Sequence, residues 1–195
     1  MSGGVCEFAQ DRAPIATEKF ALAKKIRWFA EGSKIFPLMI IGIAAVDRQG
    51  AIGKGGKLPW HYSADMKFFR EATTGHAVVM GRKTWATLGK PLKNRLNIVL
   101  SRDPSIEPQE SLLVLSDVDS VLSLNESLTT DLFVIGGAQI YEAFLPSIEK
   151  WIITEVPLKV EKADAFMPEG YLDAFEEGDT KQIGDGLVVR YYKRT

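Results

Sequence analysis

Short apolar runs rich in β-branched residues recur along the chain from residue 39 onward, each followed by a glycine or polar turn and then by helical spacing. These runs predict strands at residues 39–46, 77–80, 96–100, 112–115, 132–135 and 151–155. The runs at 77–80 and 133–135 are apolar at every position, which is typical of parallel strands covered by helices on both faces. The pattern predicts an α/β fold with a central, mostly parallel twisted sheet flanked by helices.

The polar stretches between these runs predict helices at residues 64–73, 84–88, 118–127 and 139–145, each preceded by glycine or by a residue type that caps helices. Ser63 is expected to cap the first of them. Beyond residue 175 the pattern changes to two extended stretches, 180–183 and 187–192, separated by Gly184-Asp185-Gly186. We therefore expect a C-terminal antiparallel hairpin at the edge of the sheet.

The first 38 residues do not continue this cycle. Residues 18–30 have the spacing of an amphipathic helix, with Phe20, Ile26 and Phe29 among its apolar positions. We expect one domain at residues 39–195, preceded by an extension at residues 1–38 with Met39 as an alternative start. Packing on the domain, self-association and a dispensable segment all remain open for the extension.

Composition narrows the classes of function. The 195 residues carry a formal net charge of -1 and are 46% hydrophobic, which indicates a globular protein and excludes a nucleic-acid partner held by general basic charge. The longest apolar run is too short to span a membrane, no secretion signal is evident, and the single Cys6 cannot form an intrachain disulfide. We expect a cytoplasmic protein without a membrane partner, monomeric unless the extension mediates a dimer.

The most informative stretch joins a glycine-rich segment to Leu58-Pro59-Trp60 and then to a helix carrying Asp65. Three glycines within a few residues fit a mobile lid, and an ordinary turn is the alternative. A first-turn carboxylate gains from the helix dipole, which alone would explain Asp65. Because Met66 and Phe69 lie near the same helix face, however, Asp65 is expected to point inward with a raised pKa, as suits binding of a protonatable heterocycle.

Glycine also marks two strand-to-helix junctions, at Gly81 and at Gly136-Gly137. The chain has no Gly-x-Gly-x-x-Gly fingerprint after a strand, so the standard dinucleotide-binding fold is not supported. Two helix starts of this kind instead direct unpaired N–H groups outward and can share a pyrophosphate.

Other chemistries lack candidates in the sequence. His61 and His76 belong to no cluster with metal-ligand spacing, so no metal site is expected. A Gly-x-Ser-x-Gly elbow and a Cys–His pair are both absent from the sequence, which argues against the usual nucleophilic hydrolases.

Taken in order, the motifs resemble the bacterial-type dihydrofolate reductase family over residues 39–195. They are Ile43-Ala-Ala-Val46, Ile52-Gly53, Leu58-Pro59-Trp60 with Asp65, Met80-Gly-Arg-Lys-Thr-Trp85, Arg95 with Asn97-Ile-Val-Leu-Ser-Arg102, Val134-Ile-Gly-Gly-Ala-Gln-Ile-Tyr141, and Thr154. The resemblance implies reduction of 7,8-dihydrofolate with NADPH, by hydride transfer to C6 and protonation at N5, in one-carbon and thymidylate metabolism.

The resemblance also implies roles for single residues. Asp65 would bind the pterin N3 and 2-amino group, and Thr154 would hydrogen-bond that carboxylate. Leu58, on the lid beside the reaction centre, would restrict solvent access. The catalytic set is Asp65, Leu58, Trp60 and Thr154. Arg95 would pair with the α-carboxylate of the substrate's glutamate tail, with a surface salt bridge as the alternative. The substrate set is Ile43, Ala44, Ala45, Asp65, Met66, Phe69, Leu88, Arg95, Ile135 and Thr154.

For the cofactor, the resemblance implies that Arg82, Lys83 and Arg102 recognise the 2′-phosphate of NADPH, and that the Gly136-Gly137 peptide is cis. The implied cofactor set is Ala45, Ile52, Gly53, Gly81, Arg82, Lys83, Thr84, Leu100, Ser101, Arg102, Ile135, Gly136, Gly137, Ala138, Gln139, Ile140 and Tyr141.

Two rival functions stay open. One is the related pyrimidine reductase of riboflavin synthesis, against which Asp65 after Leu58-Pro59-Trp60 and Arg95 both argue. The other is a catalytically silent folate- or nucleotide-binding protein, which the retention of Asp65, Thr154 and both glycine junctions disfavours.

Overall fold

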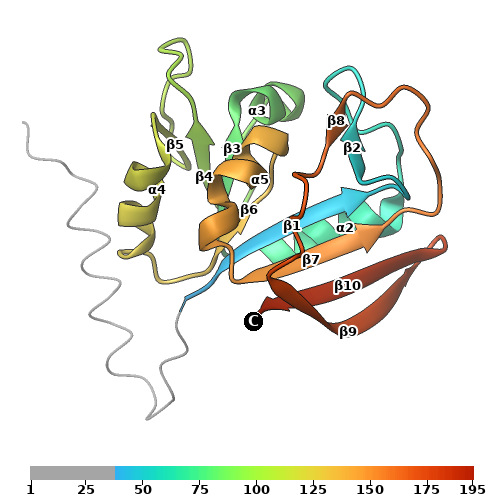
Figure 1. The fold of residues 1–195 in the computed structure, drawn as a ribbon. Coiled ribbons are helices and arrows are strands. Elements are labelled where there is room, and N and C mark those ends of the chain that lie inside the picture. The colour runs from blue at the N-terminus through green and yellow to red at the C-terminus, as the bar shows by residue number, and fades with distance from the viewer. Residues whose placement is uncertain (1–37) are drawn as a thin grey trace, which may run out of the picture. The chain divides into compact units, whose positions relative to one another are not determined.

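An eight-stranded sheet organises the part of the chain that the computed structural model describes, residues 38–195 (Figure 1). Its strand order is β5-β4-β3-β6-β1-β7-β10-β9. The bounds are β1 Ile40–Val46, β3 Ala77–Gly81, β4 Leu96–Leu100, β5 Leu112–Leu115, β6 Leu132–Val134, β7 Lys150–Glu155, β9 Phe175–Gly184 and β10 Leu187–Arg194. The helix predicted at residues 18–30 lies outside the described residues.

Strand pairing confirms the expected architecture. β1 pairs in parallel with β6 and β7, β3 pairs in parallel with β4 and β6, and β4 pairs in parallel with β5. β10 runs antiparallel to both β7 and β9. Asp185 has φ 53° between Gly184 at 101° and Gly186 at 72°, so the Gly-Asp-Gly turn adopts the left-handed conformations that glycine favours.

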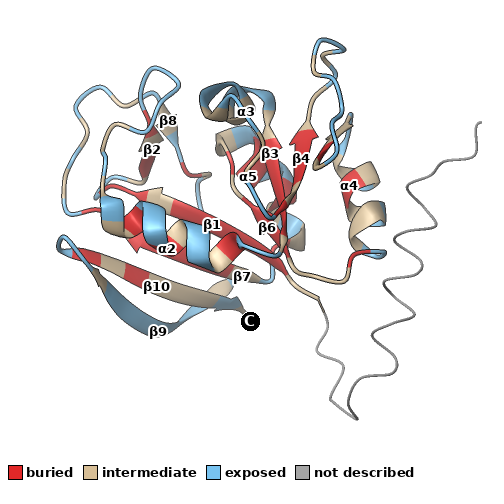
Figure 2. Cartoon of the chain, turned by 180° about the vertical axis from the view of Figure 1, so that it is seen from behind, coloured by how far each residue is buried: buried red, intermediate tan, exposed pale blue. Residues whose placement is uncertain are grey.

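Helices follow the strands where the sequence predicts them, with ends shifted by up to two residues. Their bounds are α2 Ser63–Thr73, α3 Arg82–Leu88, α4 Val118–Asn125 and α5 Ala138–Phe144, the last continuing into the 3₁₀ helix η1 Leu145–Ser147. In Figures 1 and 2, α2 lies on one face of the sheet and α5 on the other. Among residues 38–195 no helix combines the length and apolar character needed to cross a membrane.

Alternate residues of β1 supply two separate cores, because successive side chains of a strand point to opposite faces. Ile40, Ala44 and Val46 pack into the cluster that contains Val121 of α4 and Phe144 of α5. Ile41 and Ile43 pack on the opposite face in a cluster that includes Phe68 of α2. Figure 2 shows buried residues along the central strands between these two layers. The sheet is therefore apolar on both faces, as the continuous strand runs predict.

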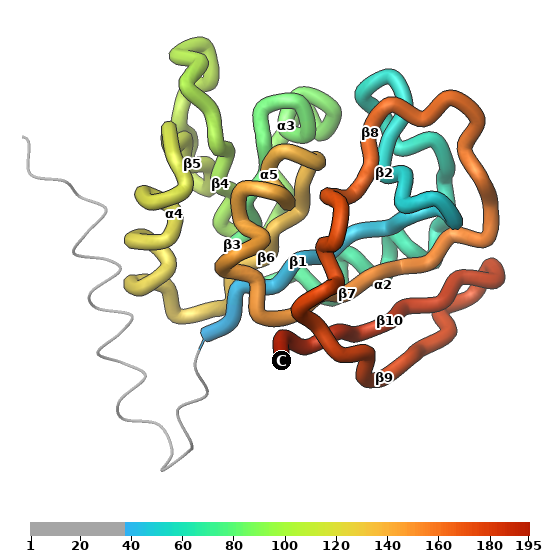
Figure 3. The backbone as a smooth tube through the Cα atoms, in the orientation of Figure 1, coloured from blue at the N-terminus to red at the C-terminus, as the bar shows by residue number. Residues whose placement is uncertain are grey.

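A second sheet was not predicted from the sequence. β2 Ala51–Gly53 and β8 Ala165–Phe166 pair antiparallel, with Ala51 opposite Phe166 and Gly53 opposite Ala165. Figure 3 shows these two segments side by side, although more than 100 residues separate them in the chain. Strands of two or three residues carry too little periodicity to be recognised, and this pairing holds the base of the glycine-rich segment.

Candidate active site

Asp65 lies in the first turn of α2, with a side chain that is only 9% exposed. The helix begins at Ser63, and Tyr62 is its N-cap residue without a side-chain cap hydrogen bond. The prediction that Ser63 caps this helix is therefore wrong. The first turn is closed instead by the backbone, since the N–H of Met66 donates to the carbonyl of Tyr62 at 3.1 Å.

Burial raises the pKa of the Asp65 carboxyl, and a hydrogen bond with the side chain of Thr154 partly opposes this effect. Thr154 is 2% exposed and lies on β7, paired with Ala45 of β1. The pairing of Asp65 with Thr154, 89 residues apart in the numbering, agrees with the predicted partnership. The inward orientation and the raised pKa predicted for Asp65 are both confirmed.

Tyr141 shares this environment. Its hydroxyl donates to the carbonyl of Ile43 at 2.8 Å, and burial together with the charge of Asp65 raises its pKa. Sequence reasoning assigned Tyr141 only to the cofactor set and did not predict its closeness to Asp65. Because α5 and α2 lie on opposite faces of the sheet, no local pattern links the two residues.

The apolar residues predicted to form the pocket wall differ in exposure. Ile43 and Ala44 are buried, while Ala45, Phe69, Leu88 and Ile135 are half-buried. Met66 is 43% exposed, so the prediction that it points inward with Asp65 is wrong. One residue along a helix turns the side chain by about 100°, and this step places Met66 at the surface beside the buried acid.

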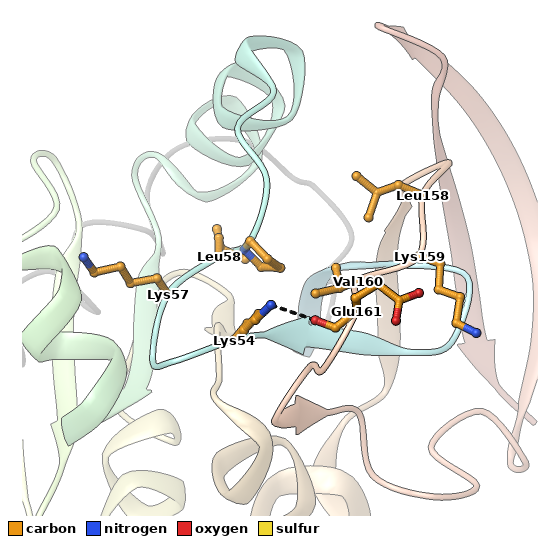
Figure 4. Close-up of a pocket in the computed structure, with 8 residues that line it drawn as sticks. Lys54, Lys57, Leu58, Leu158, Lys159, Val160 and Glu161 are labelled. Carbon is orange, nitrogen blue, oxygen red and sulfur yellow. Dashed lines mark hydrogen bonds between the residues drawn. The ribbon is translucent and has the colours of Figure 1, made fainter.

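The lid segment, residues 54–59, faces the loop at residues 158–161 across a cavity of about 490 Å³ (Figure 4). Lys54, Leu58 and Pro59 line it from the lid side, and Leu158 and Val160 line it from the loop side. Leu58 is 51% exposed, whereas the indole Nε1 of Trp60 is buried without a hydrogen-bond partner. An unpaired buried donor of this kind is suited to a bound water or to a ligand acceptor.

Two hydrogen bonds join the lid to the segment that follows β7. The N–H of Gly55 donates to Asp164 Oδ2 at 2.8 Å, and Lys54 Nζ donates to the carbonyl of Glu161 at 2.8 Å. The N–H of Asp164 in turn donates to the carbonyl of Gly53 at 3.2 Å. The lid is thus positioned by a segment more than 100 residues away, which the sequence alone did not indicate.

Arg95 is 8% exposed and has only neutral hydrogen-bond partners. Its Nη2 donates to the carbonyl of Arg70 at 3.1 Å and to the hydroxyl of Thr74 at 3.0 Å, while its Nε is buried without a partner. Burial, and then the neighbouring Arg70, lower its pKa. No carboxylate pairs with it among residues 38–195, so the alternative of a surface salt bridge is not observed.

Asn97 is a site residue that sequence reasoning missed. It is fully buried at the start of β4, and its Nδ2 donates to the carbonyls of Leu92 and Arg95 at 3.0 and 3.1 Å. Its Oδ1 accepts from the N–H of Leu92 at 2.9 Å. These bonds fix the backbone that carries Arg95. A polar residue at the head of an apolar strand was the available signal.

The two glycine junctions meet at neighbouring parallel strands. Gly81 is the N-cap of α3 and Gly137 the N-cap of α5, and the N–H of Gly81 donates to the carbonyl of Gly136 at 2.8 Å. The Gly136-Gly137 peptide is cis, as the family resemblance implies. A Cβ atom on Gly136 would lie 2.7 Å from the Tyr141 ring, so a larger residue does not fit.

The remaining residues of the predicted cofactor set lie around these junctions or on the lid strand. Arg82 and Lys83 are exposed in the first turn of α3, and Arg102 is exposed just beyond β4. Arg82 Nη1 lies 3.4 Å from Asp103 Oδ2. The others are Ile52 and Gly53 on β2, Leu100 and Ser101 at the end of β4, Thr84 on α3, and Ala138, Gln139 and Ile140 on α5. The carboxyl ends of β4, β3 and β6 thus gather most of the set at one edge of the sheet.

The two histidines lie apart from any ligand cluster. His76 packs edge-on against Phe133 with ring centroids 5.2 Å apart, and its Nδ1 lies 3.8 Å from Asp131. His61 is exposed. Across residues 38–195, no three His, Cys, Asp or Glu side chains come together in a way that could hold a metal ion.

Sequence comparison finds relatives over the same region of the chain. Residues 39–189 match the family model for dihydrofolate reductase. The dihydrofolate reductase of Bacillus subtilis is 38% identical over 147 residues, covering 74% of this chain and 82% of that protein. That of Mycobacterium tuberculosis is 40% identical over 152 residues, covering 73% and 89%.

Structural comparison agrees with the sequence comparison. Dihydrofolate reductase from Enterococcus faecalis, complexed with NADP(H) and RAB-propyl, superposes with a TM-score of 0.75 at 32% sequence identity. The match covers 80% of this chain and 96% of that chain. From a family model that spans most of the sequence and relatives at this level of identity and coverage, it follows that the chain belongs to the dihydrofolate reductase family.

Proposed function

We propose that the chain reduces 7,8-dihydrofolate to 5,6,7,8-tetrahydrofolate with NADPH, by hydride transfer to C6 and protonation at N5, and so serves one-carbon and thymidylate metabolism. The observation that carries this proposal is the buried Asp65 carboxyl, which is hydrogen-bonded to Thr154 of β7. Family membership supplies the reaction class, and Asp65 supplies the group that recognises the pterin.

The Asp65 carboxylate would accept hydrogen bonds from the pterin N3 and 2-amino group. Burial raises the pKa of Asp65, so the carboxylate form is unfavourable without hydrogen-bond donors. A ligand that donates to the carboxylate would stabilise that form, and hydrogen bonds to a charged group are stronger in a desolvated site. A carboxyl that binds N3 lies too far from N5 to transfer the proton directly, so water would deliver it. The Nε1 of Trp60, which is buried without a hydrogen-bond partner, is a suitable donor for positioning such a water.

Bound NADPH would supply the hydride, and the residues at the glycine junctions fit this cofactor. The E. faecalis relative is complexed with NADP(H). In this chain Gly81 and Gly136-Gly137 would leave room for the backbone N–H groups to approach a pyrophosphate. A Cβ at Gly81 or Gly136 would collide with Ile140 or Tyr141, so a larger residue fits at neither position. Arg82, Lys83 and Arg102 present cations for a 2′-phosphate at the same edge.

Arg95 would bind the α-carboxylate of the glutamate tail. Its guanidinium is buried, has neutral partners only, and retains an unpaired Nε, so an incoming carboxylate would satisfy both its charge and its donor. Asn97 would hold the backbone of Arg95 in place for this contact. The pterin and aminobenzoyl groups would lie against the apolar wall set Ile43, Ala44, Ala45, Phe69, Leu88 and Ile135.

The test is a spectrophotometric assay of NADPH oxidation with two substrates in parallel, together with a measurement of folate binding. Dihydrofolate should support turnover, whereas the ribosylated pyrimidine substrate of riboflavin synthesis should not. Turnover with the pyrimidine alone would establish the rival reductase. Binding of folate without any NADPH oxidation would establish the catalytically silent alternative.

For location and assembly, we propose a monomer in the cytoplasm. The single Cys6, which cannot form an intrachain disulfide, fits this reducing compartment. Sedimentation of the full chain beside a variant lacking residues 1–38 tests the assembly. A dimer that becomes monomeric on deletion would show that the extension mediates association.

A further inference from the structure

Asp47 is a buried carboxylate with no part in the proposed chemistry. It follows β1 directly and is 4% exposed. Its Oδ1 accepts from the N–H groups of Gln49 and Ala51, both at 2.8 Å, and its Oδ2 accepts from the N–H of Val160 at 2.7 Å. One side chain therefore joins the turn at residues 47–51 to a loop more than 100 residues away.

These two segments form the two sides of the lid's base. Residues 47–51 lead into β2 and then into the lid, while the loop that begins after β7 carries Val160 and Asp164. The N–H of Arg48 also donates to the carbonyl of Leu158 at 3.1 Å. Beyond this base, the loop holds the lid itself through the Gly55–Asp164 and Lys54–Glu161 bonds, both of which are exposed.

The depth of each contact decides which one sets the geometry. Exposed hydrogen bonds compete with water and open readily, whereas a buried carboxylate that loses its donors stays desolvated and unpaired. Asp47 also remains ionised: burial raises its pKa, but the three backbone N–H donors and nearby Lys159 more than offset this and lower it. The contact of Asp47 with the loop is thus stable, while the exposed Gly55–Asp164 and Lys54–Glu161 hydrogen bonds can break and re-form.

We propose that Asp47 is a positioning residue for the lid: by fixing Val160 against the base of β2, it places Asp164 where it can receive the N–H of Gly55. Asp47 belongs to neither the substrate set nor the cofactor set, and it acts through this loop. The inference rests on the proposed function insofar as lid position affects turnover, but its structural part does not depend on activity.

The principal variant is Asp47→Asn in the full chain. Asparagine keeps one acceptor oxygen for Gln49 and Ala51 but turns an N–H₂ group toward the N–H of Val160, so it breaks this contact with almost no change in volume. Asp179→Asn on the exposed strand β9, at the far edge of the sheet, is the matched control for loss of one charge.

Residue-resolved amide hydrogen exchange is the first measurement. In Asp47→Asn the amides of Gly55 and Lys57 should exchange about tenfold faster or more, while core amides such as Val79 and Ile98 keep their rates. Unchanged lid exchange, or equal acceleration in the core, would overturn the proposal. The unaltered chain gives a test that needs no variant, because the Val160 amide must exchange more slowly than that of Gly55; equal rates would also count against the anchor.

A double-mutant cycle with Asp164→Asn is the second measurement. Each single variant should lower kcat/KM for dihydrofolate by about tenfold, and the double variant should be no worse than Asp164→Asn alone because both act through one loop. Additive losses, or a shifted pH profile that implicates Asp65, would contradict positioning through this loop. If the chain shows no reductase activity while lid exchange still accelerates, the proposed function fails and the anchor stands.

Discussion

Asp65 and Asp47 are both buried carboxylates near the carboxyl edge of the sheet, yet their pKa values shift in opposite directions. Asp65 is 9% exposed, and its pKa is raised. Asp47 is 4% exposed, and its pKa is lowered. Desolvation is the largest single influence on each and raises both pKa values. The difference lies in the donors, since three backbone N–H groups donate to Asp47, whereas the Thr154 side chain is the partner of Asp65.

The comparison distinguishes a structural carboxylate, Asp47, from a carboxylate suited to binding a ligand, Asp65. At Asp47 the chain satisfies the charge that it buries, so the group stabilises the native state and is inert. At Asp65 the buried charge has fewer donors, so under the proposed function a pterin would supply the missing hydrogen bonds. Arg95 repeats the second pattern, because it is buried with neutral partners and one unpaired nitrogen.

The largest effect should come from Asp65→Asn. At neutral pH we expect kcat/KM for dihydrofolate to fall by about 10²–10⁴-fold, because the amide cannot stabilise the protonated pterin. Activity should partly recover in acid, where the substrate is already protonated. Steady-state rates between pH 5 and pH 8 (about the range where the enzyme is expected to stay folded) measure this.

Binding of NADPH, followed by quenching of tryptophan fluorescence, serves as the control and should be largely unchanged in Asp65→Asn. If turnover of Asp65→Asn at neutral pH equals that of the unaltered chain, Asp65 has no catalytic role. The difference in pKa between Asp65 and Asp47 would then have no bearing on function.

A smaller effect is expected from Arg95→Leu, which removes the second under-satisfied charge. Losing a buried charge-assisted pair with the substrate should cost about 2–5 kcal/mol of binding, seen as a raised KM with kcat less affected. Leucine leaves no unpaired charge behind, so the variant should remain folded. A pterin without the glutamate tail provides the matched substrate; an equal loss of kcat/KM with that substrate would show that Arg95 does not bind the tail.

Much of the scaffold could be predicted because it depends on local pattern. The continuous apolar runs fixed β4 and β5 to the residue and the other parallel strands within one residue at each end. Asp65 and Thr154 were predicted together only through the family resemblance, since propensity alone explains an acid in a first helical turn and a threonine in a strand.

The errors and omissions arise where distant segments meet. Asp47 follows a strand like many turn residues, and nothing in its neighbourhood reveals Val160 as its partner. β2 and β8 are too short for a periodic signal, and Met66 differs from Asp65 by a single helical position. Contacts of this kind depend on the tertiary fold rather than on spacing along the chain.

Asp47→Asn should lower the free energy of unfolding of the chain. An unpaired Val160 N–H in a partly buried site should cost about 1–3 kcal/mol at neutral pH. Because the native pKa of Asp47 is lowered, its contribution is fully present above the unfolded value of 3.8 and is lost as pH falls through that value toward the native one. Urea unfolding at pH 7 and pH 5 should therefore give the same difference, which narrows only in stronger acid. No difference at pH 7 would refute the anchor.

The smallest expected effect is a change in the free energy of unfolding that has opposite signs in Asp65→Asn and Asp47→Asn. Because the native pKa of Asp65 is raised above the unfolded value of 3.8, its stabilising contribution is confined to acid and is lost as pH rises through the native pKa. At pH 7 the buried charge is a cost, so Asp65→Asn should raise the free energy of unfolding by about 0.5–2 kcal/mol even as it removes activity. Urea unfolding of both variants at pH 7 makes the test, with Asp65→Asn more stable and Asp47→Asn less stable than the parent. If both variants were less stable than the parent, Thr154 would already satisfy the Asp65 carboxylate, and the buried charge would not destabilise the unliganded protein.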